Sequence, residues 1–263
     1  MELVRDNWGS RARIGMFIVG SEAVPEAEWW AMLPADISVH AARITAAAPW
    51  ARWRDGGTAV DLADDLSRGL QQFASMSLSV AVIGHSSSSF LGGKGWDEAV
   101  VKNLSGTLGE AVSVTTNGLD VLAALRAMRV ARPFLVLPAW FNDKTVEAGL
   151  RYFKDHGVEL AGHLRNDPGP KWRDLRPEEL YPQGAGFDQQ VEPLYAQIVA
   201  SCPDTADGIL IAGTGFRCVA ILDSLEKALQ RPVISANQAS LWHGLALAGV
   251  PSGITGYGRL LET

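Results

Sequence analysis

The chain carries two similar stretches, VAVIGHSSSSF at residues 80–90 and GILIAGTGFR at residues 208–217. Each is a short apolar run that ends in glycine or hydroxyl-bearing residues and then leads into a helical pattern. Such a run, bounded by a turn, is typical of a buried strand followed by a loop and a helix. Because this order occurs twice, the sequence predicts two loops that hold one small anion from opposite sides.

Strand and helix patterns alternate along the whole chain. Strands are predicted at residues 13–19, 37–43, 79–84, 111–115, 133–137, 158–162, 208–212 and 232–235. Helices are predicted at residues 60–75, 97–108, 118–128, 143–156, 189–201, 219–229 and 239–247. This alternation indicates βαβ units and parallel sheets. It favours two similar three-layer α/β/α lobes, although a single doubly wound sheet would also show it.

The lobe boundaries are predicted from the same pattern. We expect a first lobe at residues 1–114 plus 231–263 and a second lobe at residues 115–230. Residues 164–188 are rich in proline, glycine and charge, and we expect them to form a long surface loop that could act as a lid. Ligands of open parallel sheets sit at the carboxyl ends of the strands. The loops after residues 84, 137 and 212 are therefore the expected walls of the site.

Composition narrows the classes of function. The 263 residues carry a net charge of −6, without the basic face that nucleic acid binding requires. No stretch approaches the roughly 20 apolar residues of a membrane span, and residues 1–6 have no apolar leader core. Two cysteines are too few for a disulfide scaffold or a zinc site. We expect a cytoplasmic protein that binds neither nucleic acid nor membrane, needs no cofactor or metal, and could be a homo-oligomer.

The first loop supplies a candidate acid/base and candidate anion ligands. His85 ends the strand, where an imidazole can exchange protons near neutral pH, or can simply hold the loop backbone by hydrogen bonds. The four serines at 86–89 offer hydroxyls and backbone N–H groups to an anion, although one of them could be only a helix cap. We assign Ser86 a catalytic role beside His85, and Ser87 a substrate-binding role.

The second loop and a third strand end supply the rest of the predicted site. Gly213 and Gly215 let the backbone approach a ligand, and Thr214 adds a hydroxyl; the alternative is a tight turn without a ligand. Trp140 follows another strand end and could line the pocket or pack between the lobes. We predict a catalytic role for Thr214 and substrate contacts from Gly213, Gly215, Trp140 and Phe216.

Other reactive side chains are expected to lie outside the site. Cys218 stands five residues after Gly213, a separation that turns it away from the predicted cavity on a helix. Cys202 precedes a strand at the opposite end of the sheet, and His243 near a helix start is expected to be structural.

Several segments together resemble one protein family. They are VHAAR at 39–43, the loop at 85–90, TTN at 115–117, LPAW at 137–140, and the stretches at 213–226 and 233–243. They resemble the aspartate/glutamate racemase superfamily, in its arylmalonate decarboxylase and maleate cis–trans isomerase branch. The resemblance implies two α/β lobes with the active site in the cleft between them, and chemistry without a cofactor.

This chain departs from the resembled pattern at two positions. The family pattern often has a cysteine at the head of each loop, and here these positions hold His85 and Gly213. The carboxylate-binding positions of the family correspond to Ser86, Ser87, Thr214 and Gly215, with Trp140 in place of a tyrosine. Gly213 has no side chain that could move a proton, so the usual two-base racemisation or cis–trans isomerisation is disfavoured.

The expected function is a cofactor-independent lyase acting on a small carboxylate or related carbonyl compound. The two loops would stabilise an oxyanion or enediolate, and His85 would be the single general acid/base. One such group suffices for decarboxylation, elimination or hydration. Alternatives are a hydrolase that activates water in the same cleft and an inactive family member that binds a carboxylate. Isomerase or racemase activity with replacement groups remains a further alternative.

Overall fold

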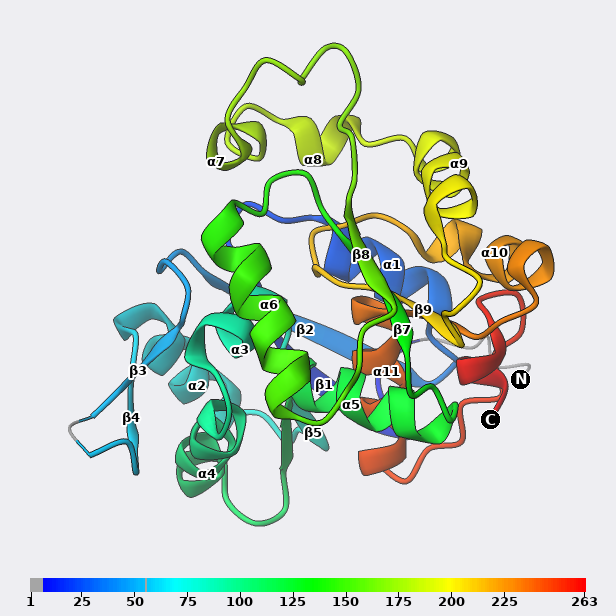
Figure 1. Cartoon of the computed structure of the whole chain (residues 1–263). Helices are drawn as coiled ribbons and strands as arrows, with labels where there is room; N and C mark the ends of the chain where they lie inside the picture. The colour runs from blue at the N-terminus through cyan, green and yellow to red at the C-terminus, as the bar shows by residue number, and fades with distance from the viewer. Residues whose placement is uncertain (1–6, 55) are drawn as a thin grey trace.

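Two four-stranded parallel sheets form the framework of the protein (Figure 1). The computed structural model describes residues 7–54 and 56–263, so the N-terminal residues 1–6, considered above as a leader, lie outside the described part. The first sheet has the order β2-β1-β5-β6. Its strands are β1 (Ala12–Val19), β2 (Ile37–Ile44), β5 (Val80–Ile83) and β6 (Ser113–Thr116).

The second sheet has the order β10-β9-β7-β8, and all its neighbours are also parallel. Its strands are β7 (Pro133–Leu137), β8 (Gly162–Arg165), β9 (Gly208–Ile211) and β10 (Val233–Ser235). Every residue of β5, β7 and β9 is buried, as expected for parallel strands that are covered on both faces. The predicted α/β class with parallel sheets is therefore confirmed.

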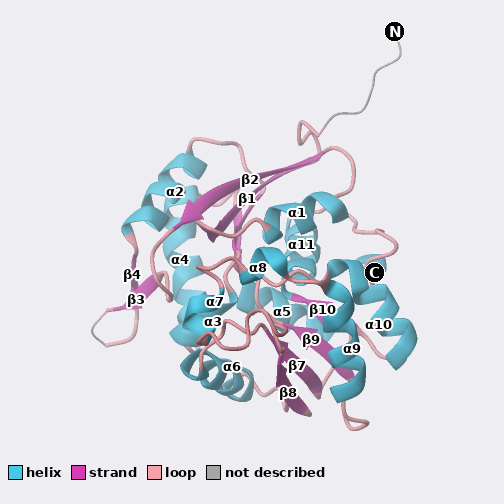
Figure 2. Cartoon of the chain, turned by 90° about the horizontal axis from the view of Figure 1, so that it is seen from above, coloured by secondary structure: helices cyan, strands magenta, loops and turns pink. Residues whose placement is uncertain are grey.

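Helices surround and separate the two sheets (Figure 2). They are α1 (Val24–Met32), α2 (Asp64–Ala74), α3 (Ser86–Gly92), α4 (Trp96–Leu108), α5 (Asn117–Ala127), α6 (Asp143–Asp155), α7 (Pro177–Leu180), α8 (Ala185–Asp188), α9 (Val191–Ser201), α10 (Leu222–Leu229) and α11 (Ala236–Leu247). Two short 3-10 helices follow at η1 (Val219–Ile221) and η2 (Arg259–Glu262). None of the helices in the described ranges is long and apolar enough to cross a membrane.

Local signals explain where the helices begin. The Asn142 side chain accepts the Thr145 N–H at 3.0 Å and caps α6. Ser235 and Gln238 form a reciprocal capping box at the start of α11. Both caps stand at the carboxyl side of a strand of the second sheet, so these strand ends are followed by defined turns.

Several predicted elements differ from the observed ones. The helix predicted at 60–75 begins only at Asp64, because residues 60–62 form β4 and pair with β3 (Ala51–Trp53) in an antiparallel hairpin. The strand predicted at 158–162 lies at 162–165. The sheets also do not follow the predicted lobe boundaries: Thr115 and Thr116 belong to the first sheet, and β10 belongs to the second.

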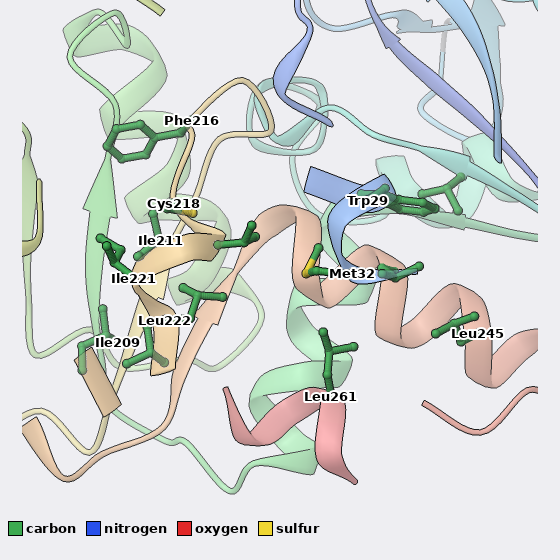
Figure 3. Packing of buried hydrophobic residues seen from close by; sticks show 14 of the residues in the cluster. Trp29, Met32, Ile209, Ile211, Phe216, Cys218, Ile221, Leu222, Leu245 and Leu261 are labelled. Atoms are coloured by element: carbon green, nitrogen blue, oxygen red, sulfur yellow. The ribbon is translucent and has the colours of Figure 1, made fainter. Parts of the chain in front are cut away.

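A continuous hydrophobic cluster joins the two sheets. It contains Met16 and Ile18 of the first sheet, Ile209 and Ile211 of the second, and Trp29 of α1. In Figure 3, Trp29 and Met32 of α1 lie near α11, and Ile209 and Ile211 of the second sheet lie to the left of this helix. The lobes thus share a core below the site, and the carboxyl ends of β1, β5, β7 and β9 meet above it.

Candidate active site

A cavity of about 430 Å³ lies where the two loops of the opening stretches meet. Its walls come from the ends of β1, β5, β7 and β9 and from the segment that carries α7 and α8. In Figure 1 that segment lies above these strand ends. The lining residues are Val19, Ser21, Glu22, His85, Ser86, Ser87, Trp140, Phe141, Tyr181, Pro182, Gly213, Thr214 and Gly215.

Ser86 connects the two loops directly. Its hydroxyl donates to Asn117 Oδ1 at 2.6 Å and accepts the Gly213 N–H at 3.2 Å. Asn117 in turn donates to the Ala236 carbonyl and to the Ser240 hydroxyl, each at 2.9 Å. A side chain of the first loop is therefore held between two elements and fixes the distance between the loops. With its hydroxyl engaged in this way, Ser86 acts in positioning, while its catalytic role stays a prediction.

The serine run is divided between the cavity and the interior. Ser87 is half-buried and lines the cavity. Ser88 Oγ accepts the Trp50 backbone N–H at 3.0 Å and lies 2.8 Å from His85 Nδ1. The Ser89 hydroxyl donates to the Asp97 carboxylate at 2.6 Å. The Ser88 and Ser89 hydroxyls point into the first lobe because α3 begins at Ser86, so the predicted anion-binding role of the serine run falls to Ser86 and Ser87, where it stays a prediction.

His85 lines the cavity but is held firmly by its surroundings. Its ring stacks on Trp50 with a centroid distance of 4.2 Å and an interplanar angle of 26°. Burial lowers the pKa of His85 to about 3, so the imidazole is neutral at pH 7. Ser88 Oγ accepts the Trp50 backbone N–H and forms a hydrogen bond with His85 Nδ1, so this ring nitrogen is already engaged by the protein. Such a ring is a weak base.

The second loop forms a tight turn against the cavity. Gly213 has a φ of +104°, a conformation that favours glycine. The Thr214 hydroxyl donates to Glu22 Oε2 at 3.3 Å, and its carbonyl accepts Asn237 Nδ2 at 2.9 Å. Within the described residues, the backbone N–H groups of Thr214 and Gly215 have no protein acceptor. They remain available to an oxyanion, whereas the Gly213 N–H is taken by Ser86.

Aromatic residues close the remaining side. Trp140 lines the cavity and makes edge contacts with Tyr181 at 5.1 Å and with Phe216 at 5.6 Å between ring centroids. Phe216, predicted to contact the substrate, is fully buried and does not line the cavity; it belongs to the shared core in Figure 3. The buried Tyr181 hydroxyl has no hydrogen-bond partner in the described part of the chain.

Six lining residues were not predicted, and two of them, Glu22 and Tyr181, have ionisable side chains. Glu22 follows β1, the strand next to β5, so the rule that ligands sit at strand ends could have found it. Burial raises the pKa of Glu22 to about 8, opposed by the hydrogen bond from Thr214. Tyr181 comes from the 164–188 segment, which supplies a cavity wall as a lid would. No sequence signal marks this tyrosine, because the segment has no strong periodicity.

The cysteines and His243 lie outside the cavity lining. Cys218 is buried beside Ile211 and Ile221 in Figure 3, and burial raises the pKa of its thiol. His243 Nδ1 lies 2.6 Å from the carboxylate of the buried Asp120, which also accepts a hydrogen bond from Ser240, the residue that Asn117 contacts. Within residues 7–54 and 56–263, no group of three or more His, Cys, Asp and Glu side chains is placed to hold a metal ion.

Two parallel α/β sheets thus place a donor-rich cavity at their facing strand ends, and this cavity is the candidate small-molecule site. A family model described as arylmalonate decarboxylase matches residues 58–261. The chain belongs to the arylmalonate decarboxylase family. The comparison with curated proteins gives no significant match.

Solved structures of two kinds of enzyme share the fold. The maleate isomerase Iso from Pseudomonas putida S16 superposes with a TM-score of 0.78 at 18% identity, covering 95% of this chain and 98% of that one. A maleate cis-trans isomerase from Nocardia farcinica gives 0.76 at 19% identity over the same shares. Unliganded arylmalonate decarboxylase gives 0.71 at 20% identity, covering 95% and 99%.

Proposed function

We propose that this protein is a cofactor-independent lyase that acts on a small carboxylate or related carbonyl compound. The observation behind this proposal is that the second loop contributes no proton-moving side chain to the cavity. On the side of the second loop, Gly213 has no side chain, and Cys218 points into the core. A reaction that needs an acid and a base on opposite faces of one carbon therefore lacks one of them, whereas a lyase step requires a single proton transfer.

The donors around the cavity support stabilisation of an oxyanion or enediolate. The N–H groups of Thr214 and Gly215, the Ser87 hydroxyl and the Tyr181 hydroxyl have no protein partner within the described residues. Donors that are already oriented toward developing negative charge contribute roughly 3–4 kcal/mol each to catalysis. Membership of a family whose model is that of a decarboxylase makes loss of CO₂ from an activated carboxylate our first choice.

The test is turnover of a panel of arylmalonates, maleate and small esters in D₂O, followed by NMR. Loss of CO₂ with incorporation of one deuterium at the former carboxyl-bearing carbon would support the lyase. Conversion of maleate to fumarate would instead identify an isomerase, and ester cleavage would identify a hydrolase. Compounds that raise the melting temperature but are never converted would favour an inactive carboxylate-binding member of the family.

A further inference from the structure

Glu22 occupies a defined place at the cavity wall. Its backbone is fixed by its own N–H, which donates to the Val19 carbonyl at 3.0 Å, and by its carbonyl, which accepts Arg43 Nη1 at 2.8 Å. Its side chain reaches the turn of the second loop, where Thr214 is its partner. At Gly215 a Cβ atom would lie 2.4 Å from Glu22 Oε1, so the absence of a side chain there makes room for this carboxyl group.

A second buried glutamate shows what a structural carboxylate looks like in this protein. Glu28 accepts the Cys218 N–H at 2.6 Å, the Val219 N–H at 3.0 Å and Asn237 Nδ2 at 2.6 Å. It does not line the cavity. Glu22 is as deeply buried, at 7% exposed against 4%, yet within the described chain it receives one hydrogen bond, of 3.3 Å. Burial raises the pKa of both glutamates, but Glu28 is tied to three protein donors away from the cavity, whereas Glu22 has one long hydrogen bond and borders the cavity, where a substrate could meet it.

The groups around Glu22 do not compensate a negative charge at its carboxyl group. His85 on the β5 side is neutral, and the Tyr181 hydroxyl from the covering segment stays protonated because burial and the nearby Glu22 raise its pKa. The Arg43 guanidinium on β2 binds the Glu22 carbonyl and the Glu26 carboxylate instead. Desolvation therefore dominates, and at neutral pH most molecules carry a proton on Glu22.

We propose that Glu22 is the catalytic residue that moves the proton in this site, in the role that the sequence predicted for His85. The inference rests on the proposed lyase function. In a decarboxylation, the bond between the α-carbon and the departing carboxylate breaks, CO₂ leaves, and the electron pair stays on the substrate as an enediolate. The Glu22 O–H bond then breaks as the α-carbon gains the proton, and water returns a proton to the Glu22 carboxylate.

His85 suits a different part in the same reaction. Its ring is stacked on Trp50, and its Nδ1 is engaged by Ser88. A neutral imidazole held in this way can form a hydrogen bond with a substrate through Nε2 but accepts a proton poorly. We expect it to hold the substrate.

The first measurement needs no substrate. Protein labelled with [¹³C]carboxyl glutamate is titrated by NMR, and the Glu22 resonance is assigned as the one missing in Glu22→Gln. A midpoint near 8 supports the proposal. A midpoint near the ordinary 4.5 overturns the assignment of Glu22 without touching the proposed lyase function.

The second measurement compares turnover of the compound that wild-type protein consumes from the D₂O panel. Glu22→Gln should lose ~10²–10⁴-fold in kcat with little change in folding, the range for a general acid. Glu192→Gln, an exposed residue of α9, is the matched control and should leave activity unchanged. His85→Asn should keep catalysis and raise KM. Full activity in Glu22→Gln overturns the proposal, and if wild type consumes nothing, the lyase function and this role fail together.

Discussion

Replacing Ser86 by alanine should destabilise the protein far more than the same change at Ser87. Ser86 is 1% exposed, and its hydroxyl joins Asn117 Oδ1 to the Gly213 N–H across the two loops. Ser86→Ala removes both hydrogen bonds and leaves one acceptor and one donor without these partners. Each unsatisfied buried group costs about 1–3 kcal/mol, so the loss in the free energy of unfolding is roughly 2–6 kcal/mol.

Urea denaturation followed by tryptophan fluorescence and by circular dichroism measures this loss as a fall in the midpoint at constant slope. Ser87→Ala is the control, because Ser87 is the next residue of α3, is half-buried, and has a hydroxyl without a protein partner in the described chain. Its change should stay within about 0.5 kcal/mol.

A double variant separates a hydrogen-bonded pair from two independent losses. Ser86→Ala combined with Asn117→Ala should cost less than the sum of the single changes, since the pair shares one interaction. Equal losses in Ser86→Ala and Ser87→Ala would refute the role of Ser86 as the connection between the loops, as would full additivity in the double variant.

Three further outcomes follow from burial and local space. The pKa of Glu22 is about 8 in the folded protein against an ordinary 4.5, so between these pH values the folded state holds a proton that the unfolded state releases, and the wild type loses stability as the pH rises through this window. Glu22→Gln should therefore be more stable than the wild type by on the order of 5 kcal/mol at pH 9 and by little at pH 5. Denaturation at both pH values measures this difference. Gly106→Ala in α4 has open space and should gain about 0.5–1 kcal/mol, whereas Gly118→Ala in α5 places a Cβ 2.3 Å from the Tyr152 hydroxyl and should lower the melting temperature. In native protein a thiol reagent should leave the buried Cys218 unmodified until denaturant is added.

The sequence was informative wherever an element is buried on both sides. The apolar runs at 80–83, 133–137 and 208–211 are strands with the predicted positions, because continuous burial leaves a continuous apolar signal. The hairpin of β3 and β4 was missed because three-residue strands have no resolvable period. The strand β8 was predicted four residues too early for a related reason. It lies at an edge of the second sheet, where its residues alternate between half-buried and exposed, and the more apolar residues stand just before it.

The location of the candidate site could be predicted from the sequence, but which side chains face the cavity, and in which protonation state, could not. Strand ends brought His85, Ser86, Trp140 and Thr214 to one cavity, as topology requires. Which hydroxyl faces the ligand depends on where α3 begins, and a run of four identical residues cannot show it. The protonation of His85 and Glu22 depends on burial and partners from distant segments, which no local pattern encodes.

The arrangement of β1 beside β5 is consistent with the proposed role of Glu22, because it places a carboxyl group near the heads of the two loops. The two strands are parallel neighbours, with Phe17 of β1 paired to Ile83 of β5, so the residues that follow them emerge at the same edge of the sheet. A carboxyl group on the β1 loop therefore reaches the cavity from a position adjacent to His85, and it faces the turn at Gly215 where a side chain would exclude it. The absence of a side chain at Gly215 leaves the space that the Glu22 carboxyl group occupies, so Gly215→Ala should displace this carboxyl group and lower activity. A fully active Gly215→Ala variant would show that the carboxyl group works from elsewhere or takes no part.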